Sequence, residues 1–197
     1  MFNPIQFYEF GKSRVVNEAA LYITNSGITR QESINSVTDL FANLKSNNLL
    51  SKCKAIYPFF GTTSQSHSLN ALNPLNTNAA FRLAFSGSSS TLSDLGYTPN
   101  TSTSNNGSAN TYFIPNSNFS GFSSGISNSV KLFRNGSQIA IGASGGLLPS
   151  IPLYIGALNF QNSQVGNRST QRIQLVIFHD GLTDAEVLKL YSIIDAS

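Results

Sequence analysis

The chain has 197 residues, of which 40% are hydrophobic and only 11% are charged, with a formal net charge of +3. This balance excludes a disordered chain, which needs low hydrophobicity and a high net charge. The basic residues are scattered, with no run of three. They lack the clustering of a surface that follows phosphates, so we expect no nucleic-acid partner.

Three further classes of protein lack their sequence signals. Cys53 is the single cysteine, which excludes a disulfide framework within the chain. No apolar run approaches the roughly 20 residues needed to cross a bilayer, so we expect no membrane insertion. The start, MFNPIQFYEF, lacks a basic region followed by an apolar one, and we expect no secretory signal peptide.

Residues 1–27 are predicted to form an arm. Aromatic and aliphatic side chains crowd its first ten residues, and a short apolar piece, AALYIT, follows them. Two interpretations stay open: an extra strand or cover over the core of the same domain, or an anchor that docks on another subunit. In the second interpretation the docking residues are Phe2, Ile5, Phe7, Tyr8 and Phe10.

Residues 28–50 are predicted to form a helix that packs against the main body. Thr29 and Glu32 have the spacing of a capping box, in which each side chain accepts a hydrogen bond from a backbone N–H at the helix start. Asn47 and Asn48 mark its end. Apolar residues at helical spacing form one stripe, which consists of Ile34, Val37, Leu40, Phe41 and Leu44.

From residue 51 onward the pattern changes to short apolar runs separated by turn residues. Asn135 and Gly136 are predicted to form a type I′ turn, because both residue types tolerate a positive φ. Many short strands without intervening helices predict an all-β sandwich or barrel over residues 51–197. The runs predicted as strands are KAIYPFF, AFRLAFS, TYFIP, VKLFR, SQIAIG, LYIGALN and RIQLVIF.

The stretch HDGLTDAEVLKLYS places one of the two histidines beside an aspartate, so it is either a site or the start of a helix. Thr183 and Glu186 form a second capping box, and Leu182 and Val187 have the spacing of a hydrophobic staple. Asp184 falls in the first turn, where the helix dipole favours negative charge. Because helix initiation accounts for the whole motif, we predict a short C-terminal helix here.

No group of residues has the pattern of a catalytic or metal site. A glycosidase needs two carboxylates across its substrate, and the predicted strands carry no acid. GFSSG and GASGG match a nucleophile elbow, but no acid lies between their serines and His179. His67 and His179 have no spaced partners, and one cysteine cannot build a zinc site. We therefore expect no enzyme, no metal and no cofactor.

Two segments, LKSNNLLSKCKAIYPFFGTTSQSHSLNALNPLNTNAAFRLAFSG and LYIGALN…QRIQLVIFHDGLTDAEVLKLYSII, resemble a module that recurs in bacteriophage virion proteins, especially of phages that infect Bacteroidetes. The module is similar to concanavalin A-like lectin or laminin-G-like sandwiches, and the resemblance covers most of residues 20–197. It implies a jelly-roll antiparallel β-sandwich with an N-terminal helix and a short C-terminal helix. One departure is that the chain passes from FIPNSNFSG to VKLFRNG without the additional strands expected there.

The resemblance implies a non-enzymatic virion surface protein, made in the host cytoplasm: a capsid decoration, head fibre or vertex spike for particle assembly, host attachment or both. Other virion proteins and further copies of the chain are the expected partners. The alternative is a carbohydrate-binding module that recognises a host surface glycan through an aromatic platform and amides. Its candidate glycan contacts, for which packing in the core is the competing interpretation, are Tyr97, Tyr112, Phe119 and Phe122.

Overall fold

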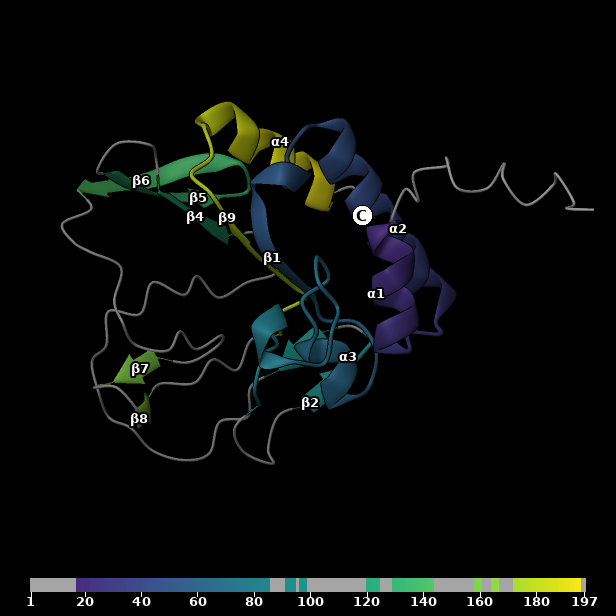
Figure 1. Cartoon of the computed structure of the whole chain (residues 1–197). Coiled ribbons are helices and arrows are strands. Elements are labelled where there is room, and N and C mark those ends of the chain that lie inside the picture. The colour runs from purple at the N-terminus through teal and green to yellow at the C-terminus, as the bar shows by residue number, and fades with distance from the viewer. Residues whose placement is uncertain are drawn as a thin grey trace, which may run out of the picture.

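The computed structural model describes residues 17–85, 91–94, 96–98, 120–124, 129–143, 158–160, 164–166 and 172–195 (Figure 1). Its α-helices are α1 (Glu18–Ser26), α2 (Gln31–Ser46), α3 (Ser64–Ser68) and α4 (Asp184–Asp195), and its 3-10 helices span Leu50–Lys52 and Asn78–Ala80. Its strands are β1 (Cys53–Pro58), β2 (Thr91–Ser93), β3 (Gly96–Thr98), β4 (Ser120–Ser124), β5 (Ser129–Arg134), β6 (Ser137–Ala143), β7 (Leu158–Phe160), β8 (Gln164–Gly166) and β9 (Leu175–His179).

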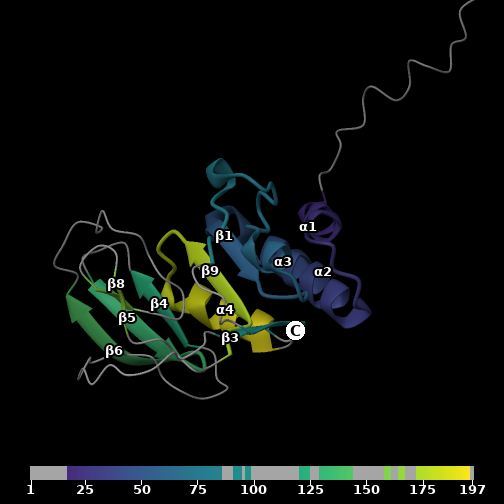
Figure 2. The same cartoon turned by 90° about the horizontal axis from the view of Figure 1, so that it is seen from below.

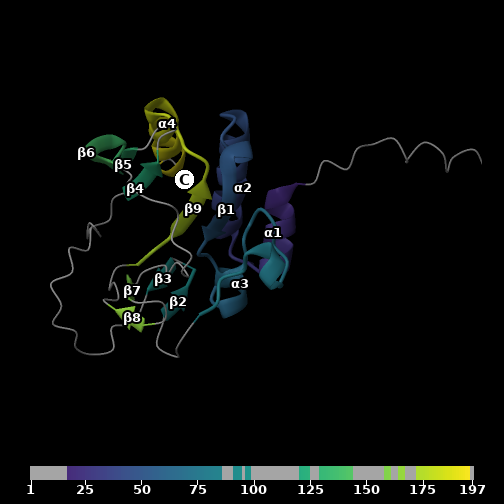
Figure 3. The same cartoon turned by 60° about the vertical axis from the view of Figure 1, so that its left-hand side comes forward.

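The described strands form small separate sheets. β1 pairs antiparallel with β9, β2 with β3 and β7 with β8, while β4, β5 and β6 form one three-stranded sheet. The predicted all-β, concanavalin A-like sandwich is therefore wrong, because the described residues form a mixed helix and strand structure. α1 and α2 lie along one side of the β1–β9 pair, where a sandwich would place strands (Figures 1, 2 and 3).

The β1–β9 pair is the centre of the packing because both of its faces are covered. Successive side chains of a strand point to opposite faces. Ile56 of β1 and Ile177 of β9 pack in the larger apolar cluster, with side chains of α1, α2 and α4. Tyr57 and Phe178 point the other way, into a smaller cluster with Phe59, and the rings of Tyr57 and Phe178 meet edge to face.

The predicted helix within residues 28–50 is confirmed as α2, and its apolar stripe is buried. Val37 and Leu44 are fully covered, and Ile34 packs at the margin of the same cluster. The predicted capping box is wrong, because Arg30 occupies the N-cap and its side chain makes no cap hydrogen bond. Glu32 instead accepts a hydrogen bond from Arg30 at 3.1 Å.

The last part of the predicted arm, residues 18–26, forms α1 and belongs to the packed core. Its Tyr22 is fully buried, and the hydroxyl donates to the carbonyl oxygens of Pro58 at 2.8 Å and Ser66 at 3.1 Å. This side chain therefore joins α1 to β1 and α3. Phe2, Ile5, Phe7, Tyr8 and Phe10 lie outside the described residues.

The hairpin and the C-terminal helix follow the prediction. Asn135 and Gly136 have φ values of 50° and 74°, as a type I′ turn requires, and they join β5 to β6. At the start of α4, the N–H of Thr183 donates to Glu186 at 2.9 Å, and the N–H of Glu186 donates to the Thr183 hydroxyl at 3.3 Å. The second capping box is therefore confirmed.

The remaining predicted strands have different outcomes. KAIYPFF and RIQLVIF contain most of β1 and β9, and VKLFR and SQIAIG contain most of β5 and β6, so these predictions are confirmed. TYFIP lies outside the described residues, and LYIGALN is described only at its end, in β7. The prediction of a strand at AFRLAFS is wrong, because residues 81–85 form no strand.

Residues 69–83 form a loop, which we call the 69–83 loop, and its ends are joined where the N–H of Leu83 donates to the carbonyl of Ser68 at 2.8 Å. The buried Asn70 side chain accepts from the N–H of Ile56 at 3.0 Å and donates to the carbonyl of Ala80 at 3.3 Å. The run AFRLAFS therefore has apolar composition without strand pairing: the Leu83 N–H and the carbonyls of Ala80 and Phe81 bond to Ser68 and to the side chains of Asn70 and Tyr57.

Candidate functional site

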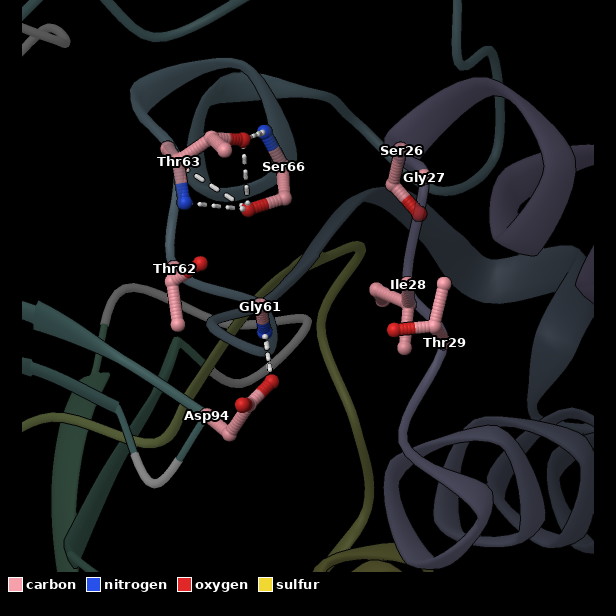
Figure 4. A pocket seen from close by; sticks show the side chains of 9 residues that line it. All are labelled: Ser26, Gly27, Ile28, Thr29, Gly61, Thr62, Thr63, Ser66 and Asp94. Atoms are coloured by element: carbon pink, nitrogen blue, oxygen red, sulfur yellow. Dashed lines mark hydrogen bonds between the residues drawn. The ribbon is translucent and has the colours of Figure 1, made fainter.

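A small polar pocket of about 70 Å³ opens where the α1–α2 turn meets the loop before α3 and the end of β2 (Figure 4). Three segments that are distant in sequence build it, and most of their side chains carry hydroxyl or carboxylate groups. The lining residues are Ser26, Gly27, Ile28, Thr29, Gly61, Thr62, Thr63, Ser66 and Asp94.

Gly61 stands at the centre of the hydrogen bonds around this pocket. Its N–H donates to a carboxylate oxygen of Asp94 at 3.0 Å, and its carbonyl accepts from Nε2 of His67 at 2.6 Å. The backbone has φ 87°, and a Cβ atom here would lie 2.5 Å from the Ser66 hydroxyl. Only glycine tolerates both the positive φ and the lack of room for a Cβ atom, so Gly61 sets the shape of the pocket.

Two of the pocket hydroxyls serve to start α3. The Thr63 hydroxyl accepts from the N–H of Ser66 at 3.0 Å, and the Ser66 hydroxyl accepts from the N–H of Thr63 at 3.3 Å. The groups left to meet a ligand are the Thr29 and Thr62 hydroxyls and the second oxygen of the Asp94 carboxylate. These groups suit a water molecule or a small polar group.

His67 lies behind this pocket and is 1% exposed. Burial lowers the pKa of its imidazole, while contacts with the carbonyls of Gly61 and Ser93 and the charge of Asp94 oppose that shift. The ring packs against Phe59, with centroids 5.7 Å apart. The neutral ring therefore joins the loop to the core, and a substrate in the pocket would not reach it.

We expect the free energy of unfolding to fall as the pH is lowered from 7 to 5. Because burial lowers the pKa of His67 in the folded chain, the unfolded chain binds a proton first, and the stabilisation by the neutral ring is lost below about pH 6.5. Glu186 stays ionised in this window, since its pKa is about 2. Urea titrations at several pH values measure the slope of the free energy of unfolding against pH.

The two histidines provide a matched comparison for that measurement. His67→Asn removes the buried imidazole and should flatten the slope between pH 7 and 5, whatever its effect on stability at neutral pH. His179→Gln, at the end of β9, is the matched variant, and if it flattens the slope as much as His67→Asn does, the assignment to His67 is wrong. Equal slopes in His67→Asn and the parent chain would contradict the assignment to His67.

The His179–Asp180 motif lies away from this pocket, and its acidic neighbours form ion pairs with lysines. Asp180 pairs with Lys54 at 2.8 Å, and Glu186 pairs with Lys52 at 2.6 Å. The hydrogen bond from Lys52, followed by that from the backbone N–H of Thr183, lowers the pKa of Glu186 to about 2. These bonds attach the start of α4 to the start of β1.

A third ion pair attaches α4 to β5, where Lys131 meets Asp184 at 2.6 Å. The sequence identified the acids of this motif but not their lysine partners, because each pair joins residues more than 50 positions apart. The only sign of these partners in the sequence was that two of the lysines flank Cys53.

Burial raises the pKa of the Cys53 thiol to about 11, so it remains protonated at neutral pH.

The described residues include two of the four candidate glycan contacts, Tyr97 and Phe122. The Tyr97 ring packs between Phe59 and Phe85, with centroids 5.7 Å and 5.4 Å away. Phe122 belongs to β4, whereas Tyr112 and Phe119 lie outside the described residues. Tyr97 therefore contributes to the smaller apolar cluster.

The polar pocket could not be recognised from sequence spacing, because its three segments meet only after folding. Within the described part of the chain, no three His, Cys, Asp or Glu side chains gather closely enough to bind a metal ion. The helices described here include none with the length and apolar character needed to cross a membrane. Comparison with family models, curated proteins and solved structures gives no match to this chain.

Proposed function

We propose that this protein is a non-enzymatic surface protein of a bacteriophage particle, which assembles through contacts with other virion proteins and with copies of itself. The first support is the resemblance of two sequence segments to phage virion modules. β1 comes from the first segment and β9 and α4 from the second, and these elements pack together. The segments that carry the resemblance thus contribute to one core.

The observation that carries the proposal is that the polar side chains considered as a site bond within the chain, whereas several large apolar side chains are exposed to solvent. Asp180, Asp184 and Glu186 pair with lysines of the same chain, and Asp94 and His67 bond to the backbone. Large apolar side chains of the described residues are exposed, namely those of Leu21, Leu75, Phe81, Ile139, Ile141 and Leu188. Exposed apolar groups of this kind mark contact surfaces more often than reaction centres.

The proposal is tested on purified phage particles, in which mass spectrometry should detect this chain at a defined copy number. A low number per particle fits a vertex spike or fibre, and a high number fits a lattice decoration. Absence of the chain from particles whose genome encodes it would contradict the proposal.

Deletion of residues 1–12 should yield a folded, soluble protein that no longer joins the particle. The described members of the apolar clusters all lie at or after Ala19, so the deletion removes none of them. Circular dichroism and a thermal melt that match the full chain provide the folding control. Incorporation at the full-length copy number would show that the arm is not the anchor.

Glycan recognition is the alternative function, and the same truncated protein separates it from assembly. A surface protein that serves assembly alone should give no saturable binding on a glycan array. Saturable binding of one glycan class, retained after deletion of residues 1–12, would favour the receptor-binding module.

A further inference from the structure

Phe81 has a backbone conformation and an exposure that both cost free energy in the isolated chain. Its φ is 57°, in the left-handed region that bulky residues rarely adopt, and its side chain is 71% exposed. Burial of the ring therefore offsets little of the free energy that the strained backbone costs. An outlier of this kind suggests that the side chain is held for contact with another molecule.

The surrounding bonds hold Phe81 in this conformation. The Tyr57 hydroxyl donates to the Phe81 carbonyl, and Asn70 binds the carbonyl of the preceding Ala80. Because the loop is fixed before any partner arrives, docking of the ring would require little further ordering. Beside it, Arg82 is exposed and forms no ion pair with any described residue. The loop therefore presents an apolar ring next to a cation that no described carboxylate pairs.

A second exposed apolar surface lies on β6 and α4, and we call it the β6–α4 patch; it consists of Ile139, Ile141 and Leu188. Leu188 lies against the hairpin turn, since a Cβ on Gly136 would be 3.2 Å from its side chain. Ile141 pairs in register with Lys131, whose ammonium group binds Asp184 at 2.6 Å. The patch is therefore apolar, with the ion pair of Lys131 and Asp184 at its border.

The edge of this patch lacks the features that prevent strand association. β6 is an outer strand in the order β4-β5-β6 of the described sheet, and its sequence SQIAIGA contains neither charge nor proline. Natural edge strands commonly carry such residues to prevent contact with another chain. Here the exposed isoleucines stand at that edge.

We propose that Phe81 and Arg82 of one copy of this chain dock on the β6–α4 patch of a second copy. The ring would meet aliphatic side chains, and the guanidinium would meet the carboxylate of Asp184, which is 57% exposed and also binds Lys131 through both of its oxygens. The inference rests on the self-assembly included in the proposed function and names the surfaces that perform it.

The two surfaces lie apart on the molecule. Tyr57, which binds the 69–83 loop, packs in the smaller cluster, whereas α4 packs in the larger cluster on the other face of the β1–β9 pair. The loop and β6 are separated in two views (Figures 1 and 2). Each copy can therefore bind one neighbour with its loop and another with its patch, which produces rings or open chains.

The test uses the purified full-length chain and needs no particles. Sedimentation analysis over a range of concentrations should show the parent chain assembling in a concentration-dependent manner beyond a dimer. Phe81→Gly removes the ring and suits the positive φ, and Ile141→Lys places a charge in the patch. Each change should weaken association by more than about tenfold, as loss of a central contact does.

Mixing the two variants gives the sharpest result. Phe81→Gly retains an intact patch and Ile141→Lys retains an intact loop, so the mixture should form dimers that grow no further. A contact between two identical surfaces would instead leave one of the two variants assembling by itself as the parent chain does, and would overturn the proposal. Thermal melts should show that both variants are folded, with Phe81→Gly at least as stable as the parent.

Leu21→Ser is the matched control, because Leu21 is an exposed apolar residue of α1 outside both surfaces. This variant should assemble as the parent does. A parent chain that remains monomeric at every concentration, or single variants that assemble as well as the parent, would contradict the inference. Neither result would bear on the presence of the chain in particles, so the proposed function is tested separately.

Discussion

Gly61→Ala should lower the free energy of unfolding by about 3 kcal/mol, through left-handed strain of about 1–2 kcal/mol together with a steric clash. The backbone has φ 87°, and the added Cβ would lie 2.5 Å from Oγ and 2.8 Å from Cβ of Ser66. Ser66 cannot move away easily, because its side chain and N–H form the capping box of α3 with Thr63. Urea denaturation measures the change.

Gly27 provides the control that separates backbone strain from the clash. It also has a positive φ, 69°, but a Cβ there would meet nothing within 4 Å. Gly27→Ala should therefore cost only the left-handed strain, about 1 kcal/mol. Equal losses in the two variants would show that the contact with Ser66 contributes nothing.

Asn70→Ala should lower the free energy of unfolding by a similar amount, about 3 kcal/mol, because it leaves buried backbone groups without partners. Asn70 is 2% exposed, and its carbonyl oxygen accepts from the N–H groups of Ile56 at 3.0 Å and Leu72 at 3.2 Å. Its amide donates to the carbonyl of Ala80 at 3.3 Å. Ile56 of β1 is fully buried, so water cannot replace the lost acceptor.

Asn73→Ala is the matched control, since Asn73 is an exposed asparagine of the same loop. Removing its side chain should change stability by less than about 0.5 kcal/mol, as for other surface positions. Urea denaturation monitored by circular dichroism compares the two variants. A loss below about 1 kcal/mol for Asn70→Ala would contradict the role assigned to its hydrogen bonds.

The polar pocket and the β6–α4 patch illustrate the limit of reasoning from sequence. Thr29, Gly61 and Asp94 are far apart in the chain, and nothing in their spacing indicates that they line one pocket. The ion pairs of Lys52 and Lys131 with residues of α4 are similarly distant. Such contacts depend on how whole elements pack, which local patterns do not encode.

The sequence by itself determined the elements whose cause is local. The stripe of α2, the turn at Asn135 and Gly136 and the capping box of Thr183 and Glu186 each depend on residues only a few positions apart, so their residue types were sufficient to predict them. For the same reason, the HDGLTDAE motif was recognised as a helix start.

Only the tertiary structure decided what covers the strands. Apolar alternation shows that a strand face is buried, but a sheet and a helix bury it equally well. In this chain α1, α2 and α4 cover one face of the β1–β9 pair, so helices stand in the described part where a sandwich would have a second layer of strands. The left-handed Phe81 likewise follows from the closed 69–83 loop, since a single residue adopts a strained conformation only where its surroundings impose it.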